Sequence, residues 1–178
     1  MKMGGAATDW DYGELQSQQN HMIWLTTTAH ELGHAFGLLH EHQRPDRNDH
    51  VSYNCEMLIG YPAALYRALQ DGFTESDLCN VAIVANLYDF CSREFTQNGN
   101  LVDGASGSKD YDMDSIMHYT SMNFANPELY KNHPGVPRFL PLVRKDKDGS
   151  LHIIEEPKPF PDFDVTDLDA QGTKAMYP

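Results

Sequence analysis

The feature that most constrains this chain is a helical segment that carries His30 and His34 and leads to a third histidine, His40. On an α-helix, residues four apart lie about 40° from each other around the axis and about 6 Å apart along it, so the first two imidazoles can reach one ion. Gly37 permits the left-handed backbone that ends a helix, and three more residues bring His40 round to the same point. Glu31 lies about 100° from its neighbour, where it can meet a metal-bound water without binding the metal. The segment therefore predicts a metal site at the end of one helix.

The same helix is predicted to bury an apolar face. From about residue 21 to residue 39, apolar side chains recur at helical spacing and form one stripe. Its members are Leu25, Ala29, Leu32, Phe36 and Leu39. We expect the stripe to pack into the core and the histidines to face away from it.

Zinc is the metal that this pattern favours. Three neutral imidazoles and a water form the open tetrahedral site typical of catalytic zinc, whereas structural zinc is more often enclosed by thiolates. None of the three cysteines, Cys55, Cys79 and Cys91, lies near the motif. Unrelated histidines on a polar helix face would reproduce the five fixed positions of HExxHxxGxxH in about one chain in ten thousand of this composition. We therefore set a chance match aside.

Charge and hydropathy limit the partners of the chain. With 13 Lys and Arg against 26 Asp and Glu, the net charge of −13 repels nucleic acids and anionic membranes. No apolar run approaches the roughly 20 residues of a membrane-spanning helix. At 40%, apolar residues are too frequent for a disordered acidic chain. The 178 residues are thus expected to form one globular domain, with no nucleic-acid and no membrane partner.

Helices are predicted at three further places. Residues 62–69 and 74–90 have helical patterns, and Thr74 with Asp77 has the spacing of a capping box. Residues 164–178 resemble a short capped helix at the end of the chain.

A β-hairpin is predicted over residues 139–154, because apolar stretches flank an Asp-Gly turn signal. A calcium-binding loop is the alternative, with ligands that would include Asp146, Asp148 and Glu155. That loop would put Arg144 at its first ligand position, where a cation has the wrong charge. The hairpin is therefore favoured.

Two motifs resemble one known family. The pattern HExxHxxGxxH, followed by Glu41 and by the run Arg44-Pro45-Asp46-Arg47, resembles the metzincin clan of zinc peptidases and, within it, the astacin family. The run Ser115-Ile116-Met117-His118-Tyr119 is similar to that family's Met-turn, and the segment from Phe160 to Pro178 is similar to the close of astacin catalytic domains. The resemblance covers about residue 21 to the C-terminus.

The resemblance implies a role for each matching residue. His30, His34 and His40 would bind zinc, with Tyr119 as an additional phenolic ligand. Glu31 would polarise the zinc-activated water as general base and then pass its proton to the leaving amine. Tyr119 would hydrogen-bond the oxyanion that forms, and Met117 would provide an apolar floor beneath the metal.

The fold class implied by the resemblance is α+β. We expect a metzincin-like zincin with a long active-site helix and an irregular, mostly helical C-terminal subdomain. Only 29 residues precede His30, too few for the sheet that astacin domains place upstream, so we expect a single domain over 1–178 with its N-terminal sheet truncated. Residues 1–20, which show no signal-peptide pattern, are expected to be a loop or strand remnant, and 96–110 an exposed loop.

The cysteines depart from the two disulfides usual in the family. If Cys79 and Cys91 share a helix, about 18 Å of rise separates them, which is too far for a bond. We therefore expect Cys55 to pair with one of them, although all three could be reduced.

The predicted function is that of a zinc-dependent metalloendopeptidase that acts on proteins or peptides. It would hold one Zn²⁺ per chain, act as a monomer and be secreted, the last as the resemblance implies. One alternative is a truncated, weak or inactive zinc-binding module that docks a protein partner. Another, which the paired motifs disfavour, is a zinc hydrolase of non-peptide amides.

Several polar residues near the motif are assigned no catalytic part. Glu41 is one of them, and Arg44, Asp46 and Arg47 are expected to form a structural charge network. The remaining histidines are expected to be surface or core residues, with His42 close enough to the site to mislead: His21, His42, His50, His118, His133 and His152.

Overall fold

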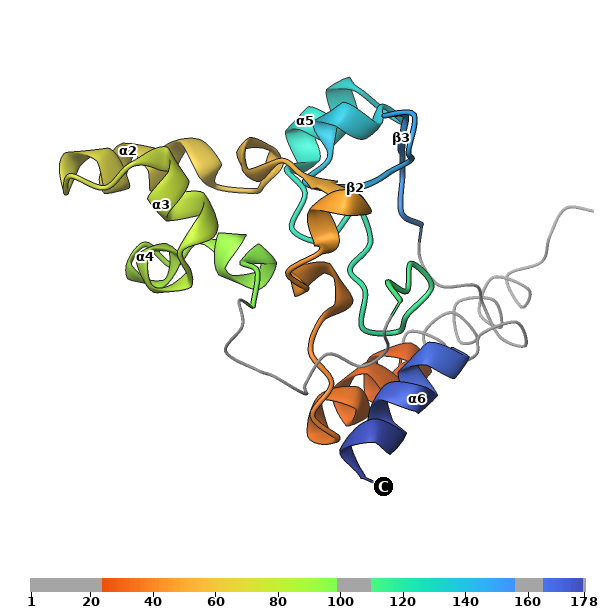
Figure 1. Cartoon of the computed structure of the whole chain (residues 1–178). Helices are drawn as coiled ribbons and strands as arrows, with labels where there is room; N and C mark the ends of the chain where they lie inside the picture. Colours follow the sequence, from red (N-terminus) through yellow and green to blue (C-terminus); the bar gives the residue numbers. More distant parts are fainter. Residues whose placement is uncertain (1–23, 99–109, 156–164, 178) are drawn as a thin grey trace, which may run out of the picture.

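The computed structural model describes residues 24–98, 110–155 and 165–177 (Figure 1). The expectations for residues 1–20 and for most of the loop 96–110 therefore lie outside the described residues. Within the described ranges, helices and one small sheet make a mixed architecture. None of the helices there combines the length and apolar content that a membrane crossing requires.

The histidine-bearing helix ends where the sequence predicts. Residues 24–35 are helical, and Gly37 takes a φ of 91° immediately afterwards. Its amide donates to the carbonyl of His34 over 2.9 Å, and the amide of Leu38 donates to the carbonyl of Gly33 over 3.0 Å. The chain therefore leaves the helix between the second and third histidines, as expected for a left-handed C-terminal glycine.

A three-stranded antiparallel sheet joins distant parts of the chain. Its strands, in spatial order, are β1 (Val51–Tyr53), β2 (Leu142–Lys145) and β3 (Leu151–His152). Ser52 lies opposite Val143 in the first pair of strands. The second pair forms the predicted hairpin, which confirms that expectation.

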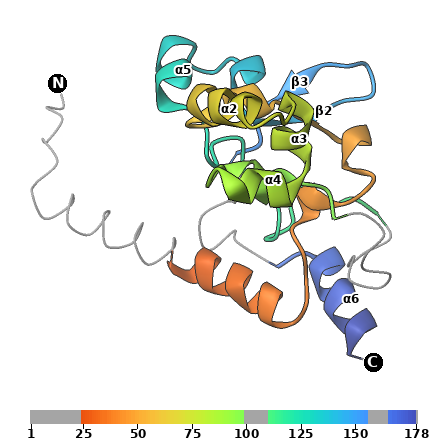
Figure 2. The ribbon, with the colours of Figure 1, turned by 90° about the vertical axis from the view of Figure 1, so that its left-hand side faces the viewer.

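Helices between β1 and residues 115–119, the segment that resembles a Met-turn and is called the Met-turn below, form one lobe of the molecule, seen from two sides in Figures 1 and 2. Thr74 and Asp77 make the predicted capping box at the start of α3. The prediction of one helix over 74–90 is wrong, because Val81 is extended (φ −117°, ψ 105°) and separates two short helices. The elements of the lobe are η3 (Cys55–Met57), α2 (Tyr61–Gln70), α3 (Glu75–Asn80), α4 (Ala82–Leu87) and η4 (Cys91–Phe95).

A disulfide between Cys55 and Cys79 joins η3 to α3 within this lobe, with Cα atoms 5.8 Å apart. Cys91 is a free thiol. The expectation that Cys55 pairs with one of the other two cysteines is confirmed. The premise that Cys79 and Cys91 share a helix is wrong, since they lie in α3 and η4.

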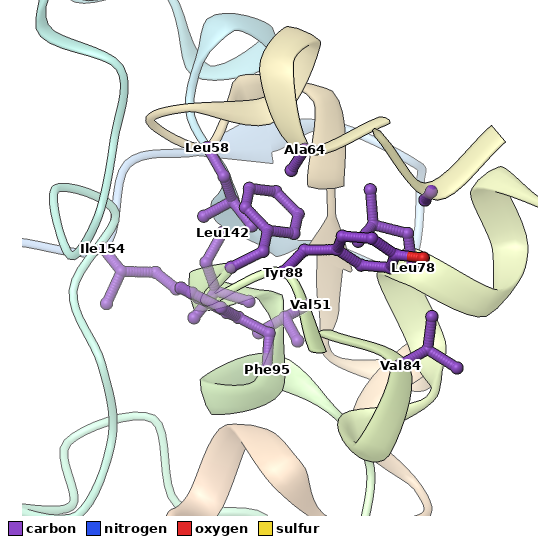
Figure 3. Close-up of a cluster of buried hydrophobic side chains, with 11 residues drawn as sticks. Val51, Leu58, Ala64, Leu78, Val84, Tyr88, Phe95, Leu142 and Ile154 are labelled. Atoms are coloured by element: carbon purple, nitrogen blue, oxygen red, sulfur yellow. The ribbon is translucent and has the colours of Figure 1, made fainter. Parts of the chain in front are cut away.

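The main apolar core lies between the sheet and the helical lobe (Figure 3). Leu58, Leu78, Phe95 and Leu142 are fully buried there, and Val51 is nearly so. The core thus combines residues of β1 and β2 with residues of α3 and η4 and with the residue that follows η3. It holds the sheet and the lobe together.

The predicted burial of the apolar stripe on the histidine helix is wrong for the described structure. Leu32, Phe36 and Leu39 are 51%, 47% and 37% exposed. A different face packs inward, where Gly33 lies against Met117 and Leu38. The sequence pattern shows that a helix face is apolar, but it does not show which segment covers it.

The C-terminal part of the chain returns to the histidine helix. After α5 (Pro127–Asn132) and η6 (Pro137–Phe139), the predicted final helix is present as α6 (Asp167–Met176), with Thr166 as its N-cap. The rings of Phe36 and Tyr177 lie 6.4 Å apart, so α6 ends beside the histidine helix.

Candidate metal centre

Three imidazoles converge at the end of the histidine helix. The Nε2 atom of His40 lies 3.1 Å from that of His30 and 3.2 Å from that of His34. Among the described residues, these three form the group of side chains whose nitrogen atoms could hold a metal ion, all within 4.8 Å of one another. The sequence-predicted trio is therefore brought together by the fold.

The other ring nitrogen of each histidine is already engaged. Nδ1 of His30 donates to the carbonyl of Ile116 over 2.8 Å, and Nδ1 of His34 donates to the carbonyl of Leu38 over 3.0 Å. Nδ1 of His40 donates to Oε1 of Gln43 over 3.1 Å. A neutral imidazole that donates from Nδ1 keeps the lone pair on Nε2, so three lone pairs face one point.

Two of the nitrogen–nitrogen distances in the trio, those from His40 to His30 and to His34, match a tetrahedral zinc site. Zinc–nitrogen bonds of about 2.0–2.1 Å in tetrahedral geometry place neighbouring nitrogens about 3.3 Å apart. The observed 3.1 and 3.2 Å are close to that value. Burial, together with His30 and His34, lowers the pKa of His40 to about 4, so this ring is neutral at neutral pH, as a ligand must be.

Met117 packs against the histidine helix. It is 1% exposed. A Cβ on Gly33 would come within 2.5 Å of its Sδ, so any larger residue at position 33 would force the sulfur to shift. The carbonyl of Met117 also accepts from the amide of Glu41 over 3.1 Å. These contacts agree with the apolar floor that the resemblance implies for Met117.

An acid on α6 fastens the Met-turn. Oδ2 of Asp169 accepts from the amide of Ile116 over 3.1 Å, and Oδ1 accepts from the hydroxyl of Ser115 over 2.6 Å. Ser115 in turn accepts from the amide of Met117 over 2.9 Å. The carbonyl of Ile116 accepts the hydrogen bond from Nδ1 of His30, so Ile116 links Asp169 to the histidine trio.

Tyr119 stands beside the third histidine. Its ring centroid lies 4.5 Å from that of His40 and 4.3 Å from that of His42. Burial, with the negative charges of Glu94 and Glu31, raises the pKa of Tyr119 to about 12. The phenol therefore keeps its proton at neutral pH and can act as a hydrogen-bond donor.

Glu31 is exposed on the histidine helix, next to His30. Its charge is close enough to Tyr119 to raise the pKa of the phenol. The two polar residues that the resemblance marks as catalytic thus come from two distant segments, the histidine helix and the Met-turn, and lie within electrostatic reach of each other.

His42 is a core residue, as expected, and not a ligand. It is fully buried, its Nε2 donates to the carbonyl of Glu94 over 2.9 Å, and its Nδ1 accepts from the amide of Tyr119 over 3.4 Å. Burial, with His118 as the next cause, lowers its pKa well below the usual value, so the ring is neutral. Both nitrogens serve the backbone, which leaves neither for a metal.

The other described histidines also lie outside the trio. His118 is buried and accepts from the hydroxyl of Tyr111 over 2.8 Å. His50 stacks on Tyr111, His133 stacks on Phe139, and His152 lies 3.0 Å from Asp146. His21 lies outside the described residues.

The predicted charge network is correct for two of its members. Arg44 binds Asp46 through two bonds of 2.9 and 2.8 Å and Glu41 through one of 3.0 Å. Burial raises the pKa of Glu41 to about 7, against the opposing effects of the Asp112 amide and Arg44. Arg47 was expected in this network, and that is wrong: within the described residues it forms no ion pair and donates to the carbonyls of His42 and Phe95.

Two residues at this centre were not foreseen from the sequence. Gln43 contacts His40, and Asp169 contacts Ser115 and Ile116, which precede Met117. Gln43 lies three positions after His40, and that spacing was the only signal available. Asp169 lies 53 positions from Ile116, and no local pattern links them.

Comparison with known proteins gives the same family as the motifs. The model of the astacin peptidase family matches residues 15–93. An astacin-like metalloendopeptidase of Coturnix japonica is 28% identical over 176 residues, which is 99% of this chain and 30% of that protein. Nematocyst expressed protein 6 of Nematostella vectensis is 33% identical over 97 residues, 54% of this chain and 23% of that protein. Bone morphogenetic protein 1 of Xenopus laevis is 33% identical over 97 residues, 54% of this chain and 10% of that protein. The chain thus spans less than a third of the length of these relatives.

Proposed function

We propose, from the premise that this chain is astacin-like in sequence, that it is a zinc-dependent metalloendopeptidase. The observation that carries the proposal is the convergence of three imidazoles at the end of the helix that also carries Glu31, with Nε2 of His40 3.1 Å from that of His30 and 3.2 Å from that of His34. The family likeness supports a metallopeptidase in general. The catalytic roles below are our assignment.

His30, His34 and His40 would hold the metal, with Tyr119 as an additional ligand. When bound, zinc acts as a Lewis acid that polarises a carbonyl oxygen and lowers the pKa of water. Glu31, exposed on the helix next to His30, would take the proton from the attacking water as general base. The same carboxyl would then give that proton to the departing amine.

Tyr119 would stabilise the charge that develops on the substrate. Its phenol keeps its proton, since its pKa is raised to about 12, and it can donate a hydrogen bond to the oxyanion of the tetrahedral intermediate. Met117 takes no part in bond making and supports the ligands from below.

The setting proposed for this activity is extracellular. The disulfide between Cys55 and Cys79 fits an oxidising compartment, because cytosolic thiols are kept reduced. The substrate class we propose is protein or peptide, which the likeness to a peptidase family supports, and the net charge of −13 opposes nucleic acid. We expect the chain to act as a monomer and to form a single domain.

A second candidate is a zinc-binding module of little or no activity that docks a protein. The exposed apolar side chains of Leu32 and Phe36 on the histidine helix favour it, because they offer a surface for a partner.

The test compares cleavage of denatured casein with and without a zinc chelator, in wild type, Glu31→Gln and Glu56→Gln. Glu56 is an exposed glutamate in η3 and serves as the matched control. We expect chelator-sensitive cleavage that Glu31→Gln loses by at least about 100-fold, as for a general base, and that Glu56→Gln retains. Stoichiometric zinc without cleavage would favour the docking module, and full activity in Glu31→Gln would refute the mechanism.

A further inference from the structure

The three histidines of the metal centre differ in what holds their outer nitrogens. His30 and His34 donate to backbone carbonyls, of Ile116 and Leu38, which no side-chain substitution removes. His40 donates to a side chain, Oε1 of Gln43, over 3.1 Å. His40 is also the ligand that lies beyond the helix, in residues 38–40 without regular structure. Its ring therefore depends on a side chain for an orientation that the backbone sets for the other two.

Gln43 is itself held in place from two directions. Its amide donates to the carbonyl of His40 over 3.0 Å, so the residue folds back over the ligand in η1 (Glu41–Gln43). From the other side, the amide of Asn98 donates to the carbonyl of Gln43 over 2.8 Å, and Nδ2 of Asn98 donates to Oε1 over 3.4 Å. Two donors thus face one oxygen, which fixes the acceptor end of the amide towards His40.

We propose that Gln43 is a positioning residue that fixes the tautomer and ring orientation of His40 and thereby sets the affinity of the three-histidine centre for a divalent metal. The inference rests on the metal site of the proposed function. An acceptor at Nδ1 keeps the proton there, so that the lone pair of Nε2 faces the point shared with His30 and His34. Without the acceptor, the ring can rotate or carry its proton on Nε2, and both changes remove a ligand.

The experiment measures dissociation constants for zinc and cobalt(II) by competition with a chromophoric chelator at neutral pH. Three variants are compared with wild type: Gln43→Leu, Gln43→Glu and Gln97→Leu. The first removes the acceptor at similar size, and the second keeps an acceptor oxygen and adds a charge. Gln97→Leu is the matched control, because Gln97 donates to the carbonyls of Arg44 and Pro45 and contacts no ligand histidine among the described residues.

We expect Gln43→Leu to bind both metals about 10–100-fold more weakly, the usual effect of removing an outer partner of a ligating histidine. Gln43→Glu should bind at least as tightly as wild type, since a carboxylate acceptor raises the basicity of the ring. Gln97→Leu should match wild type. The visible absorption bands typical of tetrahedral cobalt(II) should be present in wild type and Gln43→Glu. They should be weaker in Gln43→Leu.

Unchanged affinity in Gln43→Leu would overturn the inference. Equal weakening in Gln43→Leu and Gln43→Glu would overturn it too, because a packing role would then explain both. If circular dichroism shows that Gln43→Leu does not fold, Gln43→Glu decides alone, and weaker binding than wild type refutes the inference. Wild type that binds no metal would overturn this inference and the proposed function together. Metal binding without casein cleavage would leave the positioning role intact and count against the peptidase.

Discussion

The hydrogen bonds between α6 and the Met-turn predict a large loss of stability for one substitution far from the histidine motif. Asp169 is 7% exposed and accepts two hydrogen bonds, from the hydroxyl of Ser115 and the amide of Ile116. Asp169→Ala removes both acceptors and leaves two donors without a partner. Each unsatisfied buried donor costs about 1–3 kcal/mol, so the free energy of unfolding should fall by about 2–6 kcal/mol. For a chain of this size that corresponds to a loss of about 4–24 °C in Tm.

The effect should reach the metal centre as well as the stability. Ile116 supplies the carbonyl that accepts from Nδ1 of His30. When its amide loses Asp169, the turn can shift, and the orientation of His30 is then less well fixed. We expect zinc affinity to fall together with Tm in Asp169→Ala.

Two further variants make the assay decisive. Asp169→Asn keeps one acceptor oxygen and should lose about half as much stability as Asp169→Ala. Asp167→Ala changes an exposed acid in the same first turn of α6 and should cost only the interaction with the helix dipole, about 0.3–1 kcal/mol. The measurements are thermal unfolding by circular dichroism and zinc competition. If Asp169→Ala unfolds at the same temperature as Asp167→Ala, the network does not fasten the turn and the reasoning is refuted.

Three more predictions follow from the cap, the disulfide and the metal. The hydroxyl and amide of Thr74 hold the pKa of Asp77 below its usual value. A lowered pKa adds stability at pH values above the pKa of the unfolded chain, and that stability is lost as acid protonates the folded group. Thr74→Ala should therefore raise the pKa of Asp77 in an NMR titration and reduce the loss of stability that acid causes below about pH 4. Replacing both Cys55 and Cys79 by alanine should cost about 3.5 kcal/mol for a loop closed over 24 positions, whereas Cys91→Ala should cost less than about 1 kcal/mol in urea unfolding; equal losses would contradict the assignment. Zinc at 100 times its dissociation constant should stabilise the chain by about 2.7 kcal/mol, and a chelator should reverse the gain in Tm. A Tm that changes with neither zinc nor chelator would count against a metal site in the folded chain.

Local sequence patterns predicted the parts of the structure that local physics controls. The end of the histidine helix was predictable because Gly37 is the residue that tolerates a φ of 91°. The cap at Thr74 and the hairpin turn are likewise set by residues close to one another in the sequence. The break at Val81 was missed because the sequence continues a helical apolar pattern, and the extended backbone there (φ −117°, ψ 105°) has no glycine or proline to mark it.

In the candidate site, too, some features follow from local sequence and others depend on distant residues. The convergence of His30, His34 and His40 follows from helical spacing and one glycine, so the sequence alone predicts it. What orients the rings does not follow, because the carbonyl that binds His30 is 86 positions away and the amide that holds Gln43 is 55 positions away. The burial of the apolar stripe failed for the same reason, since periodicity describes one helix and burial needs its neighbours. Which histidines come together is therefore decided by local sequence in this chain, whereas the orientation of their rings depends on tertiary contacts. Substitutions that weaken metal binding without touching a histidine should accordingly concentrate on residues that join distant segments, such as Asp169, which ties α6 to the Met-turn.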